Sequence, residues 1–221
     1  EGNSARLLTQ LLSALKAKAT PAFKDKVARR SAVIRVEHAQ NQRRSAQMAS
    51  SPGSLDAINP HFLFALLGQA IRGHDVVLNE AIRNTMAVFE QIPRHIPGTL
   101  IGLPGGGLGF SGGTALGIKL AHPERRVIHV VGDGSFYFSN PSALYAVSRQ
   151  QKLPIWTVLL DNGGWSAVKE STLRMYPQGS AHGQQRFESG LGYETDFAAI
   201  AEAACAHGER LRDPAQAQAA I

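Results

Sequence analysis

The sequence of 221 residues has a single cysteine, Cys205, and no long apolar run. One cysteine excludes an internal disulfide framework and a zinc site built from cysteines, and makes a reducing compartment the default expectation. No apolar stretch approaches the roughly 18 residues that a membrane-spanning helix needs. Because 43% of the residues are apolar and 18% are charged, the composition is that of a globular chain. We therefore expect a cytoplasmic protein with no membrane partner.

The excess of positive charge is confined to the first 50 residues. They carry ten Lys or Arg against three Asp or Glu, whereas residues 51–221 carry 13 against 14, which together give the net charge of +6. A basic segment can bind nucleic acid, and its affinity would then fall steeply with salt. With Phe23 as its one aromatic residue, this segment is more typical of a solvated helix face or a linker. We expect no nucleic-acid partner.

The chain divides into a helical segment and a larger domain. Leucines recur at helical spacing over residues 5–18, and a polar, Arg- and Gln-rich helix is expected over residues 25–48. A break with Pro and Gly at residues 50–54 marks a boundary. We interpret residues 1–51 as the end of a preceding middle domain with a basic helical linker. Residues 52–221 are then the functional domain, whose C-terminal end we expect to be truncated.

Short apolar runs alternate with helices throughout this domain. Strands are predicted over residues 74–80, 99–103, 126–131 and 153–160. Helices are predicted over residues 61–71, 114–122 and 142–151, with Asn59 and Asn140 as N-caps before Pro60 and Pro141. This alternation is typical of an α/β fold with a doubly wound parallel sheet flanked by helices, here preceded by a helical segment. In such folds ligands bind at loops after the carboxyl ends of the strands.

One of these loops resembles a dinucleotide-binding motif. Gly107, Gly109 and Gly112 form a GxGxxG pattern before a helix, and Asp133 follows 21 residues later at the end of a strand. An NAD(P)-binding Rossmann-type oxidoreductase that uses residues 107–112 is therefore the alternative interpretation. Two features count against it, because the glycine-rich turn is longer than the motif requires and glycines flank Asp133 on both sides.

The segment GDGS at residues 132–135 favours a metal and phosphate site. Its glycines let backbone N–H groups approach a phosphate, Asp133 offers a hard oxygen ligand, and Ser135 can donate a hydrogen bond. After the next strand, Asn162 supplies an amide oxygen and Gly164 an unshielded carbonyl. These oxygen donors suit Mg²⁺, with phosphate oxygens and a water completing an octahedral shell.

The order of these loops resembles a known family. The runs VVLNE, GGLGF, ALGIKLAHPERRVIHVVGDGS and LPIWTVLLDNGGW, over residues 52–212, are similar to the pyrophosphate-binding domain of thiamine diphosphate-dependent enzymes such as benzoylformate decarboxylase and acetolactate synthase. The resemblance implies thiamine diphosphate and Mg²⁺ as cofactors and a decarboxylase or carboligase acting on 2-oxo acids. It also implies a homodimer or homotetramer, and an activating glutamate on a domain outside this sequence, so no catalytic residue is assigned here.

The resemblance assigns roles to individual residues. Asp133, Asn162 and the Gly164 carbonyl would hold the metal. The implied cofactor-binding residues are Arg83, Asn84, Gly106, Gly107, Leu108, Gly132, Asp133, Gly134, Ser135, Asn162, Gly164 and Trp165. Among them the Gly106 backbone would contact the aminopyrimidine, and Leu108 would support the bent cofactor. Val168 and Ser171 would face the substrate.

The chain departs from the family at two places. The usual Asn-Asn pair is Asp161-Asn162, and metal binding should survive because the second position is the ligand. The loop after Leu78 has Arg83 and Asn84 where relatives present hydroxyl, Gln or His side chains to the diphosphate. The identity of the 2-oxo acid does not follow from the sequence.

Overall fold

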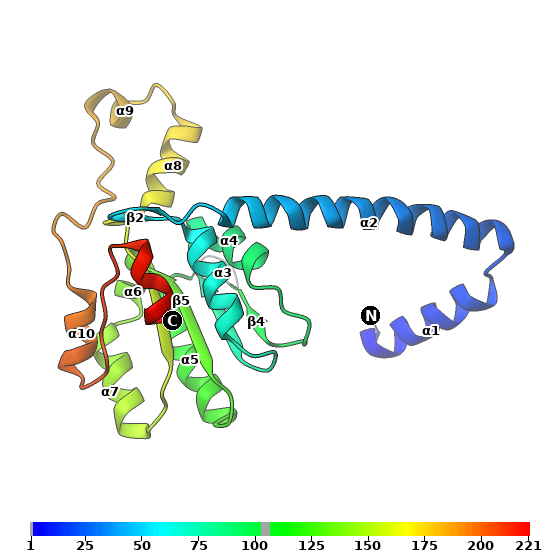
Figure 1. The fold of residues 1–221 in the computed structure, drawn as a ribbon, viewed down its shortest axis with the longest axis horizontal. Helices are drawn as coiled ribbons and strands as arrows, with labels where there is room; N and C mark the ends of the chain where they lie inside the picture. The colour runs from blue at the N-terminus through cyan, green and yellow to red at the C-terminus, as the bar shows by residue number, and fades with distance from the viewer. Residues whose placement is uncertain (1, 103–106) are drawn as a thin grey trace. The chain divides into compact units, whose positions relative to one another are not determined.

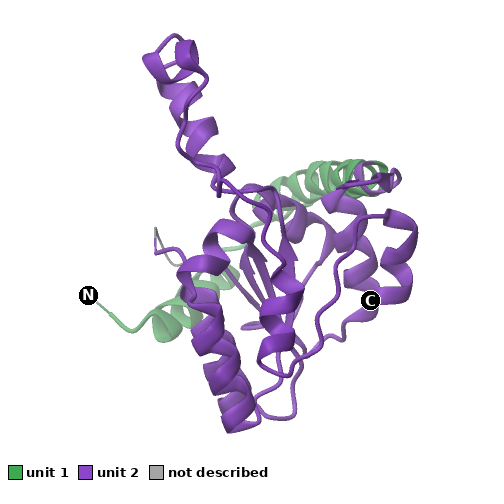
Figure 2. Cartoon of the chain, turned by 90° about the vertical axis from the view of Figure 1, so that its left-hand side faces the viewer, with its two compact units in different colours: residues 1–47 green, residues 48–221 purple. Residues whose placement is uncertain are grey.

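The computed structural model describes residues 2–102 and 107–221 and divides the chain into two compact units, Glu1–Gln47 and Met48–Ile221 (Figure 2). The first unit is helical, with α1 over Ser4–Ala17 and most of α2, which spans Pro21–Ala49. Asn3 caps α1 by accepting a hydrogen bond from the Arg6 N–H at 3.1 Å. Neither helix has a buried residue, so their stability comes from helix propensity rather than from a core.

The second unit is built on a four-stranded parallel sheet in the order β4-β3-β5-β6 (Figure 1). Its strands are β3 (Val76–Glu80), β4 (Leu100–Ile101), β5 (Val127–Gly132) and β6 (Trp156–Leu160). A short antiparallel pair, β1 (Gly53–Ser54) and β2 (Ala57–Ile58), precedes the sheet. The order steps outward in both directions from β3 and β5, as in doubly wound sheets, which confirms the predicted fold class.

Helices connect the strands. They are α3 (Pro60–Ala70), η1 (Ile82–Asn84), α4 (Thr85–Gln91), α5 (Phe110–Ala121), α6 (Asp133–Phe138), α7 (Pro141–Gln151), α8 (Ser166–Met175), α9 (Ser180–Gln184), α10 (Phe197–Ala203), η2 (Pro214–Gln216) and α11 (Ala217–Ala220). Among the described residues, no helix is both long enough and apolar enough to cross a bilayer.

Both faces of the sheet are covered by apolar helix faces. On one face, Phe64 and Leu67 of α3 and Val88 of α4 pack with Val77 and Ile128. On the other face, α5, α6 and α7 contribute buried side chains that pack with alternate strand residues; these are Ala115, Leu116, Phe136 and Leu144. Because successive strand residues point to opposite faces, β3 and β5 contribute side chains to both cores, which explains why both are largely apolar.

One local prediction fails and another holds only in part. Residues 132–136, interpreted from the sequence as a turn, lie mostly in the short helix α6 despite Gly134, because burial of this segment overrides the low helix propensity of glycine. Asn59 caps α3 as predicted, with the His61 N–H at 3.0 Å. Asn140 occupies the predicted N-cap position of α7, but its side chain makes no capping hydrogen bond. Asn140 lies in the left-handed region, at φ 50° and ψ 71°, because it turns the chain directly from α6 into α7.

The strand β6 has a hydrogen-bonded neighbour, β5, on one side only within the described residues. A cavity of about 1290 Å³ lies along β6, and its other wall includes the segment that carries Arg210 and Arg212. Asp161 and Asn162 also line this cavity. The metal-binding segment predicted from the sequence thus lies beside this cavity.

Candidate functional site

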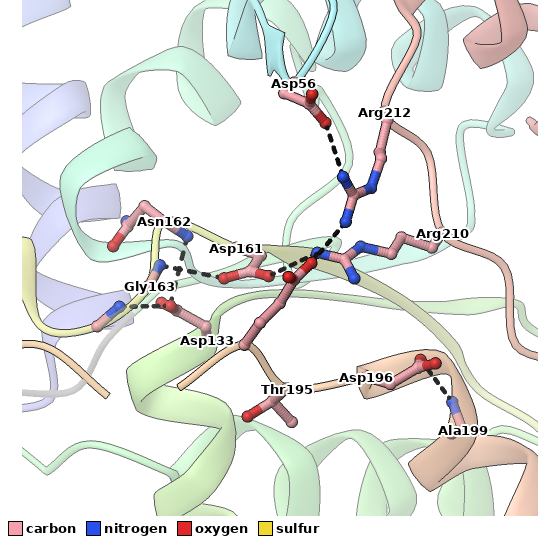
Figure 3. A network of polar contacts seen from close by, with 12 residues as sticks. Asp56, Asp133, Asp161, Asn162, Gly163, Thr195, Asp196, Ala199, Arg210 and Arg212 are labelled. Carbon is pink, nitrogen blue, oxygen red and sulfur yellow. Dashed lines mark hydrogen bonds and ion pairs between the residues drawn. The ribbon is translucent and has the colours of Figure 1, made fainter. Parts of the chain in front are cut away.

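The predicted metal residues lie at the carboxyl ends of two neighbouring strands. Gly132 at the end of β5 is in register with Leu160 at the end of β6, so the residues that follow each strand meet. The Asp133 carboxylate is 1% exposed. It accepts hydrogen bonds from the backbone N–H groups of Gly164 at 2.6 Å and Gly134 at 2.8 Å. It also accepts one from the Asn162 N–H at 3.3 Å (Figure 3). The structure therefore joins the GDGS segment to the turn after β6.

The Asp133 carboxylate has no cationic partner in these contacts. Burial raises the pKa of the Asp133 carboxyl above its ordinary value, the hydrogen bonds from Gly134 and Gly164 lower it in part, and the nearby Asp161 carboxylate raises it further. A carboxylate has about four lone-pair sites, and the backbone donors use three of them. The remaining capacity, together with the unbalanced charge, makes Asp133 suited to a cation.

The turn after β6 depends on Gly164. Its φ of +149° is outside the range that other residues adopt readily, and a Cβ there would lie 2.2 Å from the Ser189 carbonyl oxygen. The backbone N–H of Trp165 donates to that same oxygen at 2.7 Å, and the backbone N–H of Leu191 donates to the Gly163 carbonyl at 2.8 Å. Residues 189–191 thus fix the shape of the turn against Asp133.

The available donors fit Mg²⁺ that is bound together with a phosphate. Within the described parts of the chain, no three His, Cys, Asp or Glu side chains come together as a metal cluster. Asp133, the exposed Asn162 amide and the Gly164 carbonyl are hard oxygen donors, but they are too few for the octahedral shell of Mg²⁺. A metal here would therefore need oxygens from a ligand, which a diphosphate supplies.

Trp165 covers the start of α6. A Cβ at Gly134 would lie 2.5 Å from the indole nitrogen, so the glycine is required by this close approach. The indole nitrogen is buried and has no hydrogen-bond partner among the residues that the structure describes, which leaves a donor available next to Gly134 and the buried Ser135. An unpaired donor of this kind favours a polar ligand at this position.

The glycine-rich turn lies against the far end of α6. Gly109 has φ +87°, and a Cβ on it would lie 2.5 Å from the Phe138 carbonyl carbon. Gly112 packs closely on Leu144, as the third glycine of a dinucleotide motif would. However, the Asp133 carboxylate is bonded to the β6 turn and not to the glycine-rich turn, which disfavours the ribose contact of the alternative interpretation. Gly107 and the 36% exposed Leu108 are described, whereas Gly106 lies outside the described residues.

The remaining predicted residues lie near the same edge. Arg83 Nε pairs with Glu170 of α8 at 2.7 Å, and Asn84 precedes α4. Val168 and Ser171 are exposed on α8, which with α9 projects from the sheet (Figure 1). The sequence arguments for these four residues stay predictions.

The sequence analysis missed two polar clusters. Arg210 pairs with Glu194 at 2.6 Å and lies 3.9 Å from Asp161, which is the residue that departs from the family pattern (Figure 3). Arg212 pairs with Glu194 at 2.5 Å and with Asp56 at 3.4 Å. The second cluster is buried and centres on Glu80, an acidic residue that ends the apolar run VVLNE. An acidic residue at the end of an apolar strand was the signal in the sequence that could have revealed this cluster.

A doubly wound sheet that presents a carboxylate, an amide and glycine-rich backbone at its carboxyl edge is the architecture of a phosphate-binding α/β domain. Residues 83–221, which are more than half of the chain, match the family model described as "Thiamine pyrophosphate enzyme, C-terminal TPP binding domain". The chain belongs to this family, and the resemblance predicted from the sequence is confirmed. Membership implies thiamine diphosphate as the cofactor of the domain.

Several relatives have different activities. Benzoylformate decarboxylase of Pseudomonas aeruginosa is 28% identical over 112 residues, which are 51% of this chain and 21% of the relative. The acetolactate synthase isozyme 2 large subunit of Escherichia coli is 30% identical over 168 residues, which are 75% of this chain and 29% of the relative. The 3D-(3,5/4)-trihydroxycyclohexane-1,2-dione hydrolase of Bacillus subtilis is 30% identical over 115 residues, 52% of this chain and 17% of the relative.

Solved structures agree with this assignment. The thiamine diphosphate-dependent 4-hydroxybenzoylformate decarboxylase of Rhodococcus jostii RHA1 has a TM-score of 0.66 and 25% identity, over 77% of this chain and 30% of that chain. Benzoylformate decarboxylase of Polynucleobacter necessarius has a TM-score of 0.61 at 22% identity, which supports the fold alone. The chain spans less than a third of the length of each of these proteins.

Proposed function

We propose that this chain is the diphosphate- and Mg²⁺-binding part of a decarboxylase or carboligase that acts on 2-oxo acids. The observation that carries the proposal is the contact between the Asp133 carboxylate and the turn at residues 162–164. It places one buried carboxylate beside neutral oxygen donors, as a metal diphosphate requires. The 2-oxo acid class is supported by the names of the decarboxylase and synthase relatives.

The residues would divide the work as follows. Asp133, Asn162 and the Gly164 carbonyl would hold Mg²⁺, and backbone and hydroxyl donors of Gly134 and Ser135 would bind the diphosphate. When bound, the cofactor supplies an electron sink for decarboxylation. The chain's own part is to hold that cofactor in one orientation and to present Val168 and Ser171 to the substrate. The same proposal includes a site shared with another copy of the chain, in a homodimer or homotetramer. Exposed apolar residues on α8 and directly after it are suited to such a protein contact; these are Val168, Met175 and Tyr176.

Isothermal titration calorimetry with thiamine diphosphate tests the proposal. We expect binding in the presence of Mg²⁺, its loss when a chelator is added, and its loss in the Asp133→Ala variant. Asp213→Ala is the matched control, because Asp213 caps η2 away from the site and should leave binding unchanged. Binding that ignores the chelator and survives Asp133→Ala would refute the proposal. Binding of NADH without any response to thiamine diphosphate would favour the oxidoreductase alternative.

A further inference from the structure

A second buried carboxylate lies at the end of the neighbouring strand. Glu80, the last residue of β3, is completely buried. Its Oε1 accepts a hydrogen bond from the Gly109 N–H at 2.5 Å, and its Oε2 accepts from the Ser111 N–H at 3.0 Å and from the Ser111 hydroxyl. Within the described residues, Glu80 takes part in no ion pair. The carboxylate is thus satisfied by donors at the start of α5, a helix of 12 residues whose N-terminus favours negative charge.

Ser111 and His129 connect the Glu80 carboxylate to β5 by successive hydrogen bonds. The Ser111 hydroxyl has one hydrogen and donates it to Glu80, so His129 Nε2, 2.7 Å away, must be the donor to Ser111 Oγ. His129 Nδ1 then faces the Thr157 hydroxyl at 3.4 Å as an acceptor. Burial lowers the pKa of His129 to about 4, so the ring is neutral near pH 7 and holds this single tautomer. These hydrogen bonds join β3, α5, β5 and β6 into one buried support for the start of α5.

The network also fixes Gly109, the residue directly before α5. Glu80 fixes its N–H, the Ser139 hydroxyl donates to its carbonyl oxygen at 3.1 Å, and its Cα lies against Phe138. Gly109 has φ +87°, so the direction of the preceding Gly107 and Leu108 depends on this one fixed residue. Three elements, β3, α5 and the end of α6, therefore define the glycine turn.

The surface next to this turn differs from the surface around Asp133. Leu108 is exposed at the turn, and the exposed Phe138 stacks at a tilt on Trp165 with ring centroids 5.8 Å apart. The close approach of Gly109 to Phe138 joins the turn to this aromatic pair, and apolar side chains of this kind suit the aromatic rings of a ligand rather than its charged tail. A ligand that contains both a diphosphate and aromatic rings would place its diphosphate at Asp133 and its rings beside the glycine turn.

We propose that Glu80 is a positioning residue that fixes the turn Gly107–Gly109 for the rings of the cofactor, separately from the Asp133 site that holds the diphosphate. This inference rests on the proposed function for the identity of the ligand. It assigns the two buried carboxylates at the sheet edge to different halves of one ligand. Glutamine satisfies these donors only in part, because whichever way its amide is turned, its NH₂ group faces either the Gly109 N–H or the Ser111 N–H, which then lacks an acceptor.

Two ligands distinguish binding of the cofactor rings from binding of the diphosphate. Calorimetry is carried out with thiamine diphosphate and with inorganic diphosphate, both with Mg²⁺, on the wild type and on Glu80→Gln. We expect the variant to bind thiamine diphosphate about tenfold more weakly, the equivalent of roughly one hydrogen bond, and inorganic diphosphate within about twofold of the wild type. Asp75→Asn is the matched control, since Asp75 is a buried carboxylate at the opposite end of β3. It should leave both affinities unchanged.

Amide hydrogen exchange tests the support without any ligand. The Gly109 and Ser111 amides should exchange at least about tenfold faster in Glu80→Gln, whereas the amides of β5 should keep their protection. Should Glu80→Gln fail to fold, Ser111→Ala removes one donor and the link to His129, and we expect the same pattern with a smaller change.

Equal loss of both probes, or unchanged affinity for thiamine diphosphate, would overturn the inference, as would unchanged exchange at Gly109 and Ser111. If the wild type binds neither probe, the proposed function fails, and the assignment of Glu80 to cofactor rings fails with it. In that case the exchange data still show whether Glu80 holds the turn.

Discussion

Two adjacent glycines in the β6 turn have different physical requirements. Gly163 has φ +78°, and a Cβ on it would meet nothing within 4 Å, whereas a Cβ on Gly164 would lie 2.2 Å from the Ser189 oxygen. We expect Gly163→Ala to cost about 1 kcal/mol of the free energy of unfolding through backbone strain alone. Gly164→Ala should cost several times more and abolish Mg²⁺-dependent binding, because the turn must move away from Asp133.

Chemical denaturation together with calorimetry on both variants checks this prediction. If Gly164→Ala retained the affinity of the wild type, the geometry of the turn would not determine binding. Equal destabilisation by the two substitutions would show that the contact with Ser189 does not matter.

His129 predicts a pH dependence of stability. Its pKa is lowered to about 4 in the folded protein and is near 6.5 when exposed. Between these values the unfolded chain binds more protons, so the neutral ring stabilises the fold above pH 6.5 and this contribution is lost as the pH falls toward 4. The loss amounts to at most roughly 3 kcal/mol.

Urea unfolding between pH 4 and 7 measures this effect. The free energy of unfolding of His129→Gln should fall less over this range than that of the wild type. His122→Gln is the control, because His122 is exposed and should leave the wild-type profile in place. If the free energy of unfolding of His129→Gln fell with pH as steeply as that of the wild type, the buried His129 ring would not be the cause of the pH dependence.

At the scale of elements, the two Asn-Pro sequences behave differently. The Asn59 side chain accepts from the His61 N–H and donates to the carbonyls of Met48 at 2.8 Å and Ser51 at 2.7 Å. We expect Asn59→Ala to lower the free energy of unfolding by about 1–2 kcal/mol. Asn140→Gly should have little effect or be slightly stabilising, because Asn140 makes no capping hydrogen bond and has φ 50°. Thermal unfolding of the two variants checks this, and a larger loss for Asn140→Gly would contradict it.

Most elements could be predicted from the sequence because each is specified locally. The strands β3 and β5 begin with apolar residues, Val76–Leu78 in β3 and Val127–Ile128 in β5, and α5 follows a glycine turn. What the sequence could not show depends on contacts between segments far apart in the chain. The helix α6 exists because Trp165 and Phe197 cover it, and the Asn140 cap is absent because α6 ends there.

The candidate site was predictable to a similar degree. Asp133 and the turn at residues 162–164 follow strands that the sequence places side by side, so their contact could be anticipated. The role of Glu80 could not, because its donors, Gly109 and Ser111, lie 29 and 31 residues away and the hydrogen bonds depend on how α5 starts. Periodicity shows which residues are buried but not which polar groups meet inside.

At the scale of the whole molecule, the second unit contains the buried cores and the candidate site. Neither α1 nor α2 has a buried residue. We therefore expect a chain that starts at Met48 to unfold at the temperature of the full chain and to bind thiamine diphosphate with the same affinity. Differential scanning calorimetry and titration of both chains check this. A loss of affinity on removing residues 1–47 would show that the basic helices contribute to the site.

The central claim is that one divalent ion joins the ends of β5 and β6 to the diphosphate of the cofactor. A crystal structure of the protein with Mn²⁺ in place of Mg²⁺ and with thiamine diphosphate tests it most directly, because the anomalous signal of manganese locates the ion. We predict a single peak at coordination distance, about 2 Å, from Asp133, Asn162 and the Gly164 carbonyl. A bound cofactor whose metal lies elsewhere, or whose diphosphate contacts none of these residues, would contradict the account.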